Sequence, residues 1–241
     1  MTYIYDIFSK KLTEVAPFTV DLLLPSGAEN LNYVLYTDES PYKMQREWLD
    51  RLPFDIYSVN VHTGAKRLIG RSYRTAPKWS VNGKWAVMYD PIAQVWNKFD
   101  GATGKVVNIS DAIGYPMFME SYDKPAPAPA YGIAGWTADG NNVFLYDAYD
   151  WWKIDLTGER QPECLTKGYG RKHGKSIRKM TSNIDKDVFQ KDEKVIVSLW
   201  DKDTMDEGVY QLDMKGRLRK LMEGNYVYTI HCFSDNHHLV I

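Results

Sequence analysis

Two stretches of the chain, APKWSVNGKWAVMYD at 76–90 and IAGWTADGNNVFLYD at 133–147, share one residue pattern. Each has an aromatic residue, a small polar residue, an Asn or Asp, a Gly, and then alternating apolar residues. A period of two is typical of a strand with one buried face, and Gly supplies the positive φ that tight turns need. The pattern therefore predicts a β-hairpin at each stretch.

The same hairpin recurs along the chain, at intervals a little above the ~40–50 residues of a propeller blade. Its further copies are DVFQKDEKVIVSLWD (187–201), IHCFSDNHHLVI (230–241) and a degenerate LLLPSGAENLNYVLYTD (22–38). A second kind of hairpin alternates with it and has an Asp, Asn or Ser before the turn. Its copies are YIYDIFSKKLTEV (3–15), DIYSVNVHTGAKRLI (55–69), QVWNKFDGATGKVVNI (94–109), DWWKIDLTGERQPECL (150–165) and GVYQLDMKGRLRKLM (208–222).

Each pair of alternating hairpins supplies four short antiparallel strands, which is one propeller blade. The prediction is an all-β chain, a β-propeller with four full blades and two half-blades at 3–15 and 230–241. A generic antiparallel sandwich is disfavoured because sandwiches do not repeat one signature. If the half-blades pair, the ring closes as five blades. If they do not, the chain is an arc with exposed strand edges, and the apolar run ending at Ile241 favours such a fragment of a longer protein.

Residues 1–241 are thus expected to form a single propeller domain or propeller fragment, with two irregular segments. An insertion at 39–54 is either a short protruding helix or a segment whose aromatic side chains fold onto the blade. A Pro-rich crossover loop at 110–132 contains PAPAPA (125–130), for which we expect an extended strap without hairpin hydrogen bonds.

The composition excludes several classes of protein. The 30 Lys and Arg residues balance 31 Asp and Glu residues, which argues against a nucleic-acid-binding protein, because that affinity comes mainly from neutralising phosphates. No apolar run approaches the ~20 residues of a membrane helix. The two cysteines, Cys164 and Cys232, form no CxxC or Cys/His cluster and are predicted to be unpaired thiols in non-adjacent blades.

The repeat also carries a family resemblance. WSVNGKW and WTADG resemble the W-S-P-D-G-K repeat of TolB-like (PD40) propellers, which also builds the propeller of prolyl oligopeptidase-like (S9 family) serine peptidases. The order DIYSVNVHTGAKRLI, PAPAPAYGIAGWTADG, YDAYDWWKIDLTG and LTKGYGRK is similar to large bacterial S9 peptidases. The resemblance covers about 30–225 and is most specific over 126–172.

In that family the propeller caps an α/β-hydrolase domain and restricts access to peptide-sized substrates. The resemblance implies a non-catalytic domain that gates or orients peptides for a catalytic domain absent from this chain. The alternative is a free-standing TolB-like propeller that acts as a protein–protein interaction module. Relatives of this kind are commonly exported, whereas the start of this chain lacks the order of a signal peptide, so no compartment is assigned.

We expect no enzyme activity from the chain itself. An α/β-hydrolase needs a G-x-S-x-G elbow, and the contexts of Ser26 and Ser110 show the mismatch. The carboxylates of Asp139, Asp147 and Asp155 are interpreted as turn and strand-end residues rather than glycosidase groups. DKDTMDEG (201–208) is interpreted as a hairpin turn rather than a calcium loop, and no metal or cofactor is expected.

One basic stretch is a candidate contact site. KGYGRKHGKSIRK (167–179) imitates a phosphate-binding loop with the wrong glycine spacing and is interpreted as a solvated basic loop. Alternatively, it meets an acidic surface of a partner domain or a peptide carboxylate. The candidate contact residues for a partner or peptide are Arg171, Lys172 and His173, together with Trp48 in the insertion.

Overall fold

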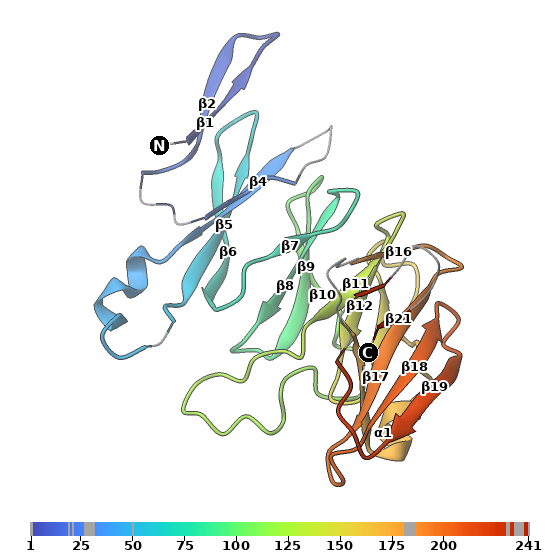
Figure 1. Ribbon diagram of the computed structural model, residues 1–241. Helices are drawn as coiled ribbons and strands as arrows, with labels where there is room; N and C mark the ends of the chain where they lie inside the picture. Colours follow the sequence, from blue (N-terminus) through green and yellow to red (C-terminus); the bar gives the residue numbers. More distant parts are fainter. Residues whose placement is uncertain are drawn as a thin grey trace. The chain divides into compact units, whose positions relative to one another are not determined.

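The computed structural model describes residues 2–18, 20, 22–26, 32–49, 51–180, 187–229, 232–233 and 239–240, with backbone alone at the last four. The chain divides into two compact units. Unit 1 comprises Met1–Asp111 and Pro125–Pro127, and unit 2 comprises Ala112–Lys124 and Ala128–Ile241. Both units are built from short strands (Figure 1).

Unit 1 contains a two-stranded hairpin and two four-stranded antiparallel sheets. The hairpin joins β1 (Thr2–Asp6) to β2 (Lys11–Ala16). The first sheet is formed in chain order by β3 (Leu22–Leu24), β4 (Tyr33–Asp38), β5 (Phe54–Asn60) and β6 (Lys66–Tyr73), with the 3-10 helix η1 (Ser40–Gln45) between β4 and β5. The second is formed by β7 (Lys78–Trp79), β8 (Trp85–Asp90), β9 (Val95–Asp100) and β10 (Val106–Asn108).

Unit 2 contains a five-stranded sheet, a four-stranded sheet and a two-stranded hairpin. The first has the order β14 (Glu163–Cys164), β13 (Trp151–Asp155), β12 (Asn142–Tyr146), β11 (Ile133–Thr137) and β16 (Val188–Phe189). The second has the order β15 (Lys175–Lys179), β17 (Lys194–Asp201), β18 (Glu207–Asp213) and β19 (Leu218–Gly224). The α-helix α1 (Tyr169–His173) precedes β15, and the hairpin joins β20 (Cys232–Phe233) to β21 (Leu239–Val240).

The predicted fold class is confirmed. The described residues form four larger sheets, each containing an antiparallel four-stranded meander like that of a propeller blade, and two two-stranded sheets at the predicted half-blades. Closure into five blades and the single-domain assignment of 1–241 stay predictions.

The hairpin predicted at 187–201 is wrong. β16 pairs in parallel with β11, with Trp136 opposite Val188, while β17 pairs antiparallel with β15. The ring of Phe189 explains why β16 pairs with β11 rather than with β17, because this ring is buried in the core of unit 2 directly over the backbone of Gly135. A Cβ atom at Gly135 would lie 2.5 Å from that ring, so the glycine makes room for β16 at the edge of β11.

Asx residues begin the hairpin turns, as the sequence pattern predicts. The Asp100 carboxylate accepts hydrogen bonds from the backbone N–H groups of Ala102 and Thr103, and Asp213 accepts them from Lys215 and Arg217. The turn glycines have positive φ, for example +68° at Gly104. The hairpins therefore form from local turn chemistry.

The extended strap predicted at 125–130 is only partly free of backbone hydrogen bonds. The N–H of Met119 donates to the carbonyl of Pro129 at 2.8 Å, and Phe118 forms an isolated antiparallel bridge with Ala130. Proline removes a donor but leaves its carbonyl as an acceptor, and the earlier part of the same loop uses it. This contact joins two parts of the loop, around Met119 and around Pro129, that both belong to unit 2.

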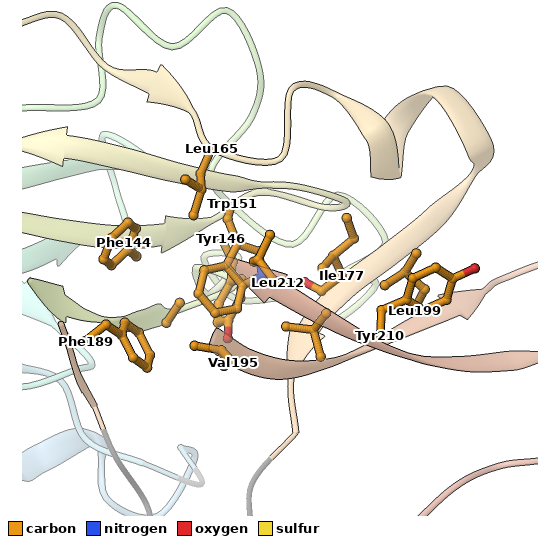
Figure 2. Close-up of a cluster of buried hydrophobic side chains, with 12 residues drawn as sticks. Phe144, Tyr146, Trp151, Leu165, Ile177, Phe189, Val195, Leu199, Tyr210 and Leu212 are labelled. Atoms are coloured by element: carbon orange, nitrogen blue, oxygen red, sulfur yellow. Dashed lines mark hydrogen bonds between the residues drawn. The ribbon is translucent and has the colours of Figure 1, made fainter. Parts of the chain in front are cut away.

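The core of unit 2 is centred on Trp151 (Figure 2). This side chain is completely buried, and its ring centroid lies 5.2 Å from that of Tyr146 and 6.2 Å from that of Phe189. Its indole N–H donates to the carbonyl of Ile177 in β15 at 3.1 Å. Trp151 thus joins the two larger sheets of unit 2, with apolar packing and one hydrogen bond.

Candidate functional site

A cavity of about 410 Å³ lies within unit 2, beside the ends of β12, β13 and β14. Its wall is formed by residues from four segments of the chain: Tyr115, Asp147, Asp150, Trp152, Cys164, Gly168, Arg171 and Lys172. Its size is within the range of small-molecule and side-chain pockets. Two of the four candidate contact residues, Arg171 and Lys172, lie in this wall.

Asp147, which directly follows β12, is completely buried and uses both of its oxygens. One oxygen accepts the backbone N–H groups of Tyr149 and Asp150. The other accepts the indole N–H of Trp152 at 3.1 Å and an Nη2–H of Arg171 at 3.0 Å. A carboxylate has about four lone-pair positions, so Asp147 has none left for a substrate.

Asp150, three residues later, is also buried. One oxygen accepts the hydroxyl of Thr166 at 2.6 Å and the N–H of Gly170 at 2.9 Å, and the other accepts the N–H of Arg171 at 3.0 Å. The carboxylate thereby fixes the start of α1. The two aspartates hold the cavity in shape, which agrees with the interpretation of Asp147 as a turn residue.

Gly170 allows α1 to approach the turn that carries Asp147 and Asp150. A Cβ atom here would lie 2.6 Å from the carbonyl oxygen of Tyr149 and 2.7 Å from that of Lys175. Any larger residue would therefore push α1 away from the turn. The close approach directs the next residue, Arg171, toward the cavity.

Arg171 is the central cation of the cavity wall. Its guanidinium lies 3.9 Å from the ring centroid of Tyr115 and pairs with Asp147. Burial alone would lower the pKa of Arg171, but the hydrogen bond and charge of Asp147 outweigh it and raise the pKa. The Nε–H group is buried and has no acceptor among the described residues. Arg171 is thus held in place with donor capacity unused.

The interpretation of 167–179 as a solvated basic loop is wrong for its backbone and for Arg178, whereas Lys167, Lys172 and His173 are exposed. Its residues form α1 and β15, and Arg178 is directed inward, donating to the carbonyls of Asp147 at 2.7 Å and Ala148 at 3.1 Å. The guanidinium of Arg178 also lies 4.7 Å from the ring centroid of Tyr146, and burial lowers its pKa. The partners that draw these cations inward come from β12 and the turn after it.

The other two candidate contacts lie outside the cavity wall. The His173 ring stacks on Tyr169 with centroids 4.1 Å apart, so it belongs to the surface of α1. Trp48 is in unit 1, where its side chain is 75% exposed. Each alternative for the insertion 39–54 holds in part: the segment contains a short helix, η1, and leaves Trp48 exposed, whereas Phe54 is buried in β5.

The remaining acidic candidates are turn residues. Asp139 accepts the hydroxyl of Thr137 at 2.6 Å and the N–H of Asn141, and Asp155 accepts the N–H groups that follow it. Asp201 in the 201–208 segment accepts the N–H groups of Asp203 and Thr204. Among the described residues, no three His, Cys, Asp or Glu side chains gather as a metal site. None of the described helices has the length and apolarity of a membrane-spanning helix.

Cys164 is a wall residue that sequence reasoning did not assign to a site. Its thiol is free and half-buried, and its sulfur accepts the N–H of Gly168 at 3.2 Å. Burial raises the pKa of the thiol. The other thiol, that of Cys232, lies outside the described residues.

Alkylation of Cys164 by iodoacetamide at pH 8 is therefore expected to be at least about tenfold slower in the native chain than in urea, because the thiolate is the nucleophile. Mass spectrometry of the peptide that contains Cys164 measures this rate separately from that of Cys232. Equal rates with and without urea would contradict the proposed burial.

No family model matches the chain, and no curated protein matches it in sequence. Similar solved structures include TolB from Acinetobacter baumannii, 13% identical with a TM-score of 0.40 over 92% of this chain and 48% of TolB. The acylaminoacyl peptidase of Pyrococcus horikoshii is 13% identical with a TM-score of 0.43, over 92% of this chain and 34% of the peptidase.

The β-propeller domain of the Trilobed protease from Pyrococcus furiosus is 14% identical with a TM-score of 0.42, over 85% of this chain and 57% of that domain. The chain thus spans less than two thirds of the length of each of these proteins. The four-stranded meanders of the chain itself define its fold class, and these likenesses assign no activity to it.

Proposed function

We propose that this chain is a non-catalytic propeller-type domain that gates or orients peptides for an S9-type serine peptidase domain absent from the chain. The observation that carries the proposal is the state of the two buried carboxylates in the cavity of unit 2. Asp147 accepts four hydrogen bonds from the chain and Asp150 accepts three. A carboxylate occupied in this way holds structure and is poorly placed for proton transfer to a substrate.

The composition of the cavity wall supports a binding role. Tyr115 and Trp152 offer aromatic surface, and Lys172 adds an exposed cation. Peptides combine apolar side chains with charged termini, so such a wall suits a peptide better than a purely polar ligand. The resemblance of the 126–172 segment to S9 propellers supports the same class of ligand.

The purified chain is expected to show no hydrolysis of chromogenic prolyl or aminoacyl peptidase substrates and no labelling by a serine-directed fluorophosphonate. The reason is that no serine of the chain lies in a G-x-S-x-G elbow. An S9 peptidase of known activity serves as the positive control. Hydrolysis that co-purifies with the chain, together with labelling on the chain, would overturn the proposal.

A free-standing interaction module is the second candidate, and the β1–β2 hairpin favours it. The turn of this hairpin exposes two apolar side chains, Phe8 at 92% and Ile7 at 70%. Exposed apolar clusters commonly mark protein contacts. If the chain binds a protein through this hairpin, Phe8→Asp abolishes that binding and leaves peptide binding by unit 2 unchanged.

A further inference from the structure

Two aromatic rings, those of Tyr115 and Trp152, lie in the wall of the cavity of unit 2. The rings of Tyr115 and Trp152 lie 6.1 Å apart, centroid to centroid, with 48° between their planes. The wall also includes Gly168, which has no side chain and where a Cβ atom would meet nothing within 4 Å. The resulting space is open to a flat or apolar group that packs against the two rings.

Some of the charged groups around the cavity are paired with one another, and one is not. The buried carboxylates of Asp147 and Asp150 are balanced by Arg171, which pairs with Asp147, and by Arg178, whose charge acts with both. Lys172 remains, exposed at the edge of the wall, and the described residues give its ammonium no hydrogen bond or ion pair. The nearby carboxylate of Glu120 acts on Arg171 but is not part of the wall.

A cationic ligand does not fit this wall. The four lone-pair positions of Asp147 are occupied, and one face of the Tyr115 ring is covered by the guanidinium of Arg171 at 3.9 Å, which leaves the other face for an apolar group. An anion, by contrast, meets the exposed ammonium of Lys172, and the partly exposed guanidinium of Arg171 adds a second positive charge beside it. The ligand chemistry that satisfies both sides is an apolar or aromatic group next to a carboxylate.

We propose that this cavity is a subsite for the C-terminal residue of a peptide, with its side chain against Tyr115 and Trp152 and its carboxylate on Lys172 and Arg171. The inference rests on the proposed function, since it takes a peptide as the ligand. It specifies which end of the peptide the cavity binds and which residues bind it. A carboxylate bonded to a cation forms a charge-assisted hydrogen bond, which makes the free C-terminus the discriminating feature.

The test compares N-acetyl-glycyl-phenylalanine as the free acid with its C-terminal amide. Two-dimensional NMR of the tryptophan indole N–H groups monitors binding, and the Trp152→Phe variant identifies the resonance of Trp152. The free acid is expected to shift this resonance saturably, and the amide to bind at least about tenfold more weakly, since a hydrogen bond to a charged group contributes about 1.5–3 kcal/mol.

Variants separate the subsite from general charge effects. Lys172→Glu is expected to weaken binding of the free acid at least about tenfold. Lys105→Glu, at an exposed turn position of unit 1, makes the same charge change and is expected to leave binding within about twofold, because it removes no contact in the cavity. Unchanged indole resonances in the free variants show that each remains folded, and Lys172→Gln provides a milder second substitution.

Three results would each overturn the subsite: equal binding of acid and amide, unaltered binding by both Lys172 variants, or no saturable shift up to the solubility limit of the acid. These outcomes are distinguishable from failure of the proposed function. Hydrolysis by the chain would remove the non-catalytic role and leave selective binding of the acid intact. Loss of that selectivity without hydrolysis removes only the subsite.

Discussion

Replacing Trp151 with alanine is expected to lower the free energy of unfolding of unit 2 by about 4 kcal/mol or more, the upper part of the range for tryptophan truncations in cores. The side chain is completely buried and packs against Tyr146 and Phe189. Its loss leaves a cavity and also leaves the carbonyl of Ile177 without the indole donor. Since domains are stable by about 5–15 kcal/mol in total, much of the variant is expected to be unfolded.

Urea denaturation followed by fluorescence measures this effect. Trp48→Ala is the matched control, because its side chain is 75% exposed and the substitution is expected to change stability by less than about 0.5 kcal/mol. Trp151→Phe retains most of the ring volume but not the N–H group, so it is expected to fall between the two. A Trp151→Ala chain as stable as the parent would show that the core of unit 2 is not centred on this residue.

The second large effect is expected for Asp147→Ala, at about 3–5 kcal/mol, the usual loss when one partner of a buried ion pair is removed. Its carboxylate accepts two backbone N–H groups, the indole N–H of Trp152 and the guanidinium of Arg171. Alanine leaves these donors without the acceptor that a completely buried carboxylate supplies. The same denaturation experiment measures the loss.

Asp100→Ala provides the comparison for this prediction. Asp100 also begins a hairpin turn and accepts two backbone N–H groups, those of Ala102 and Thr103, but these donors are exposed. Water replaces the lost acceptor there, so we expect a cost of about 1 kcal/mol. Similar losses for the two variants would mean that Asp147 is only a turn residue and that the pair with Arg171 adds nothing to stability.

The hairpins were predictable because their causes are local. Asp100 and Asp213 bond the N–H groups two to four residues later, and Gly104 and Gly216 supply the positive φ, so neighbouring residues alone determine these turns. The alternation of apolar residues then sets which face of each strand is buried. Sequence reasoning captured these features because none depends on a distant segment.

Local turn chemistry and apolar alternation did not predict which sheet β15 and β16 each join. Both KSIRK and VF are short, and each has one or two apolar residues to bury. Phe189 is buried beside Gly135, more than 50 positions away, and Ile177 is completely buried over Trp151. Tertiary packing decides between two similar local preferences, and a repeat pattern does not record it.

In the candidate site, too, local features were predicted and contacts between distant segments were not. Arg171 and Lys172 were predicted as contacts because of their charge, and both lie in the cavity wall. Their surroundings were missed, because Asp147 and Tyr115 are distant in sequence and come from a turn and a loop. The one available signal was the motif DAYDWW at 147–152, whose two aspartates bracket a tight turn before a strand with two tryptophans.

The place of β16 has a consequence for how unit 2 comes apart. Along the chain, β15 belongs to one sheet, β16 to the neighbouring sheet and β17 to the first sheet again. The chain therefore passes from one sheet to the other and back again. Neither sheet can unfold as an independent foldon unless Phe189 first leaves its packing position against β11. Unit 2 is expected to melt as one cooperative body, in contrast to repeat arrays whose modules fray one at a time from an end.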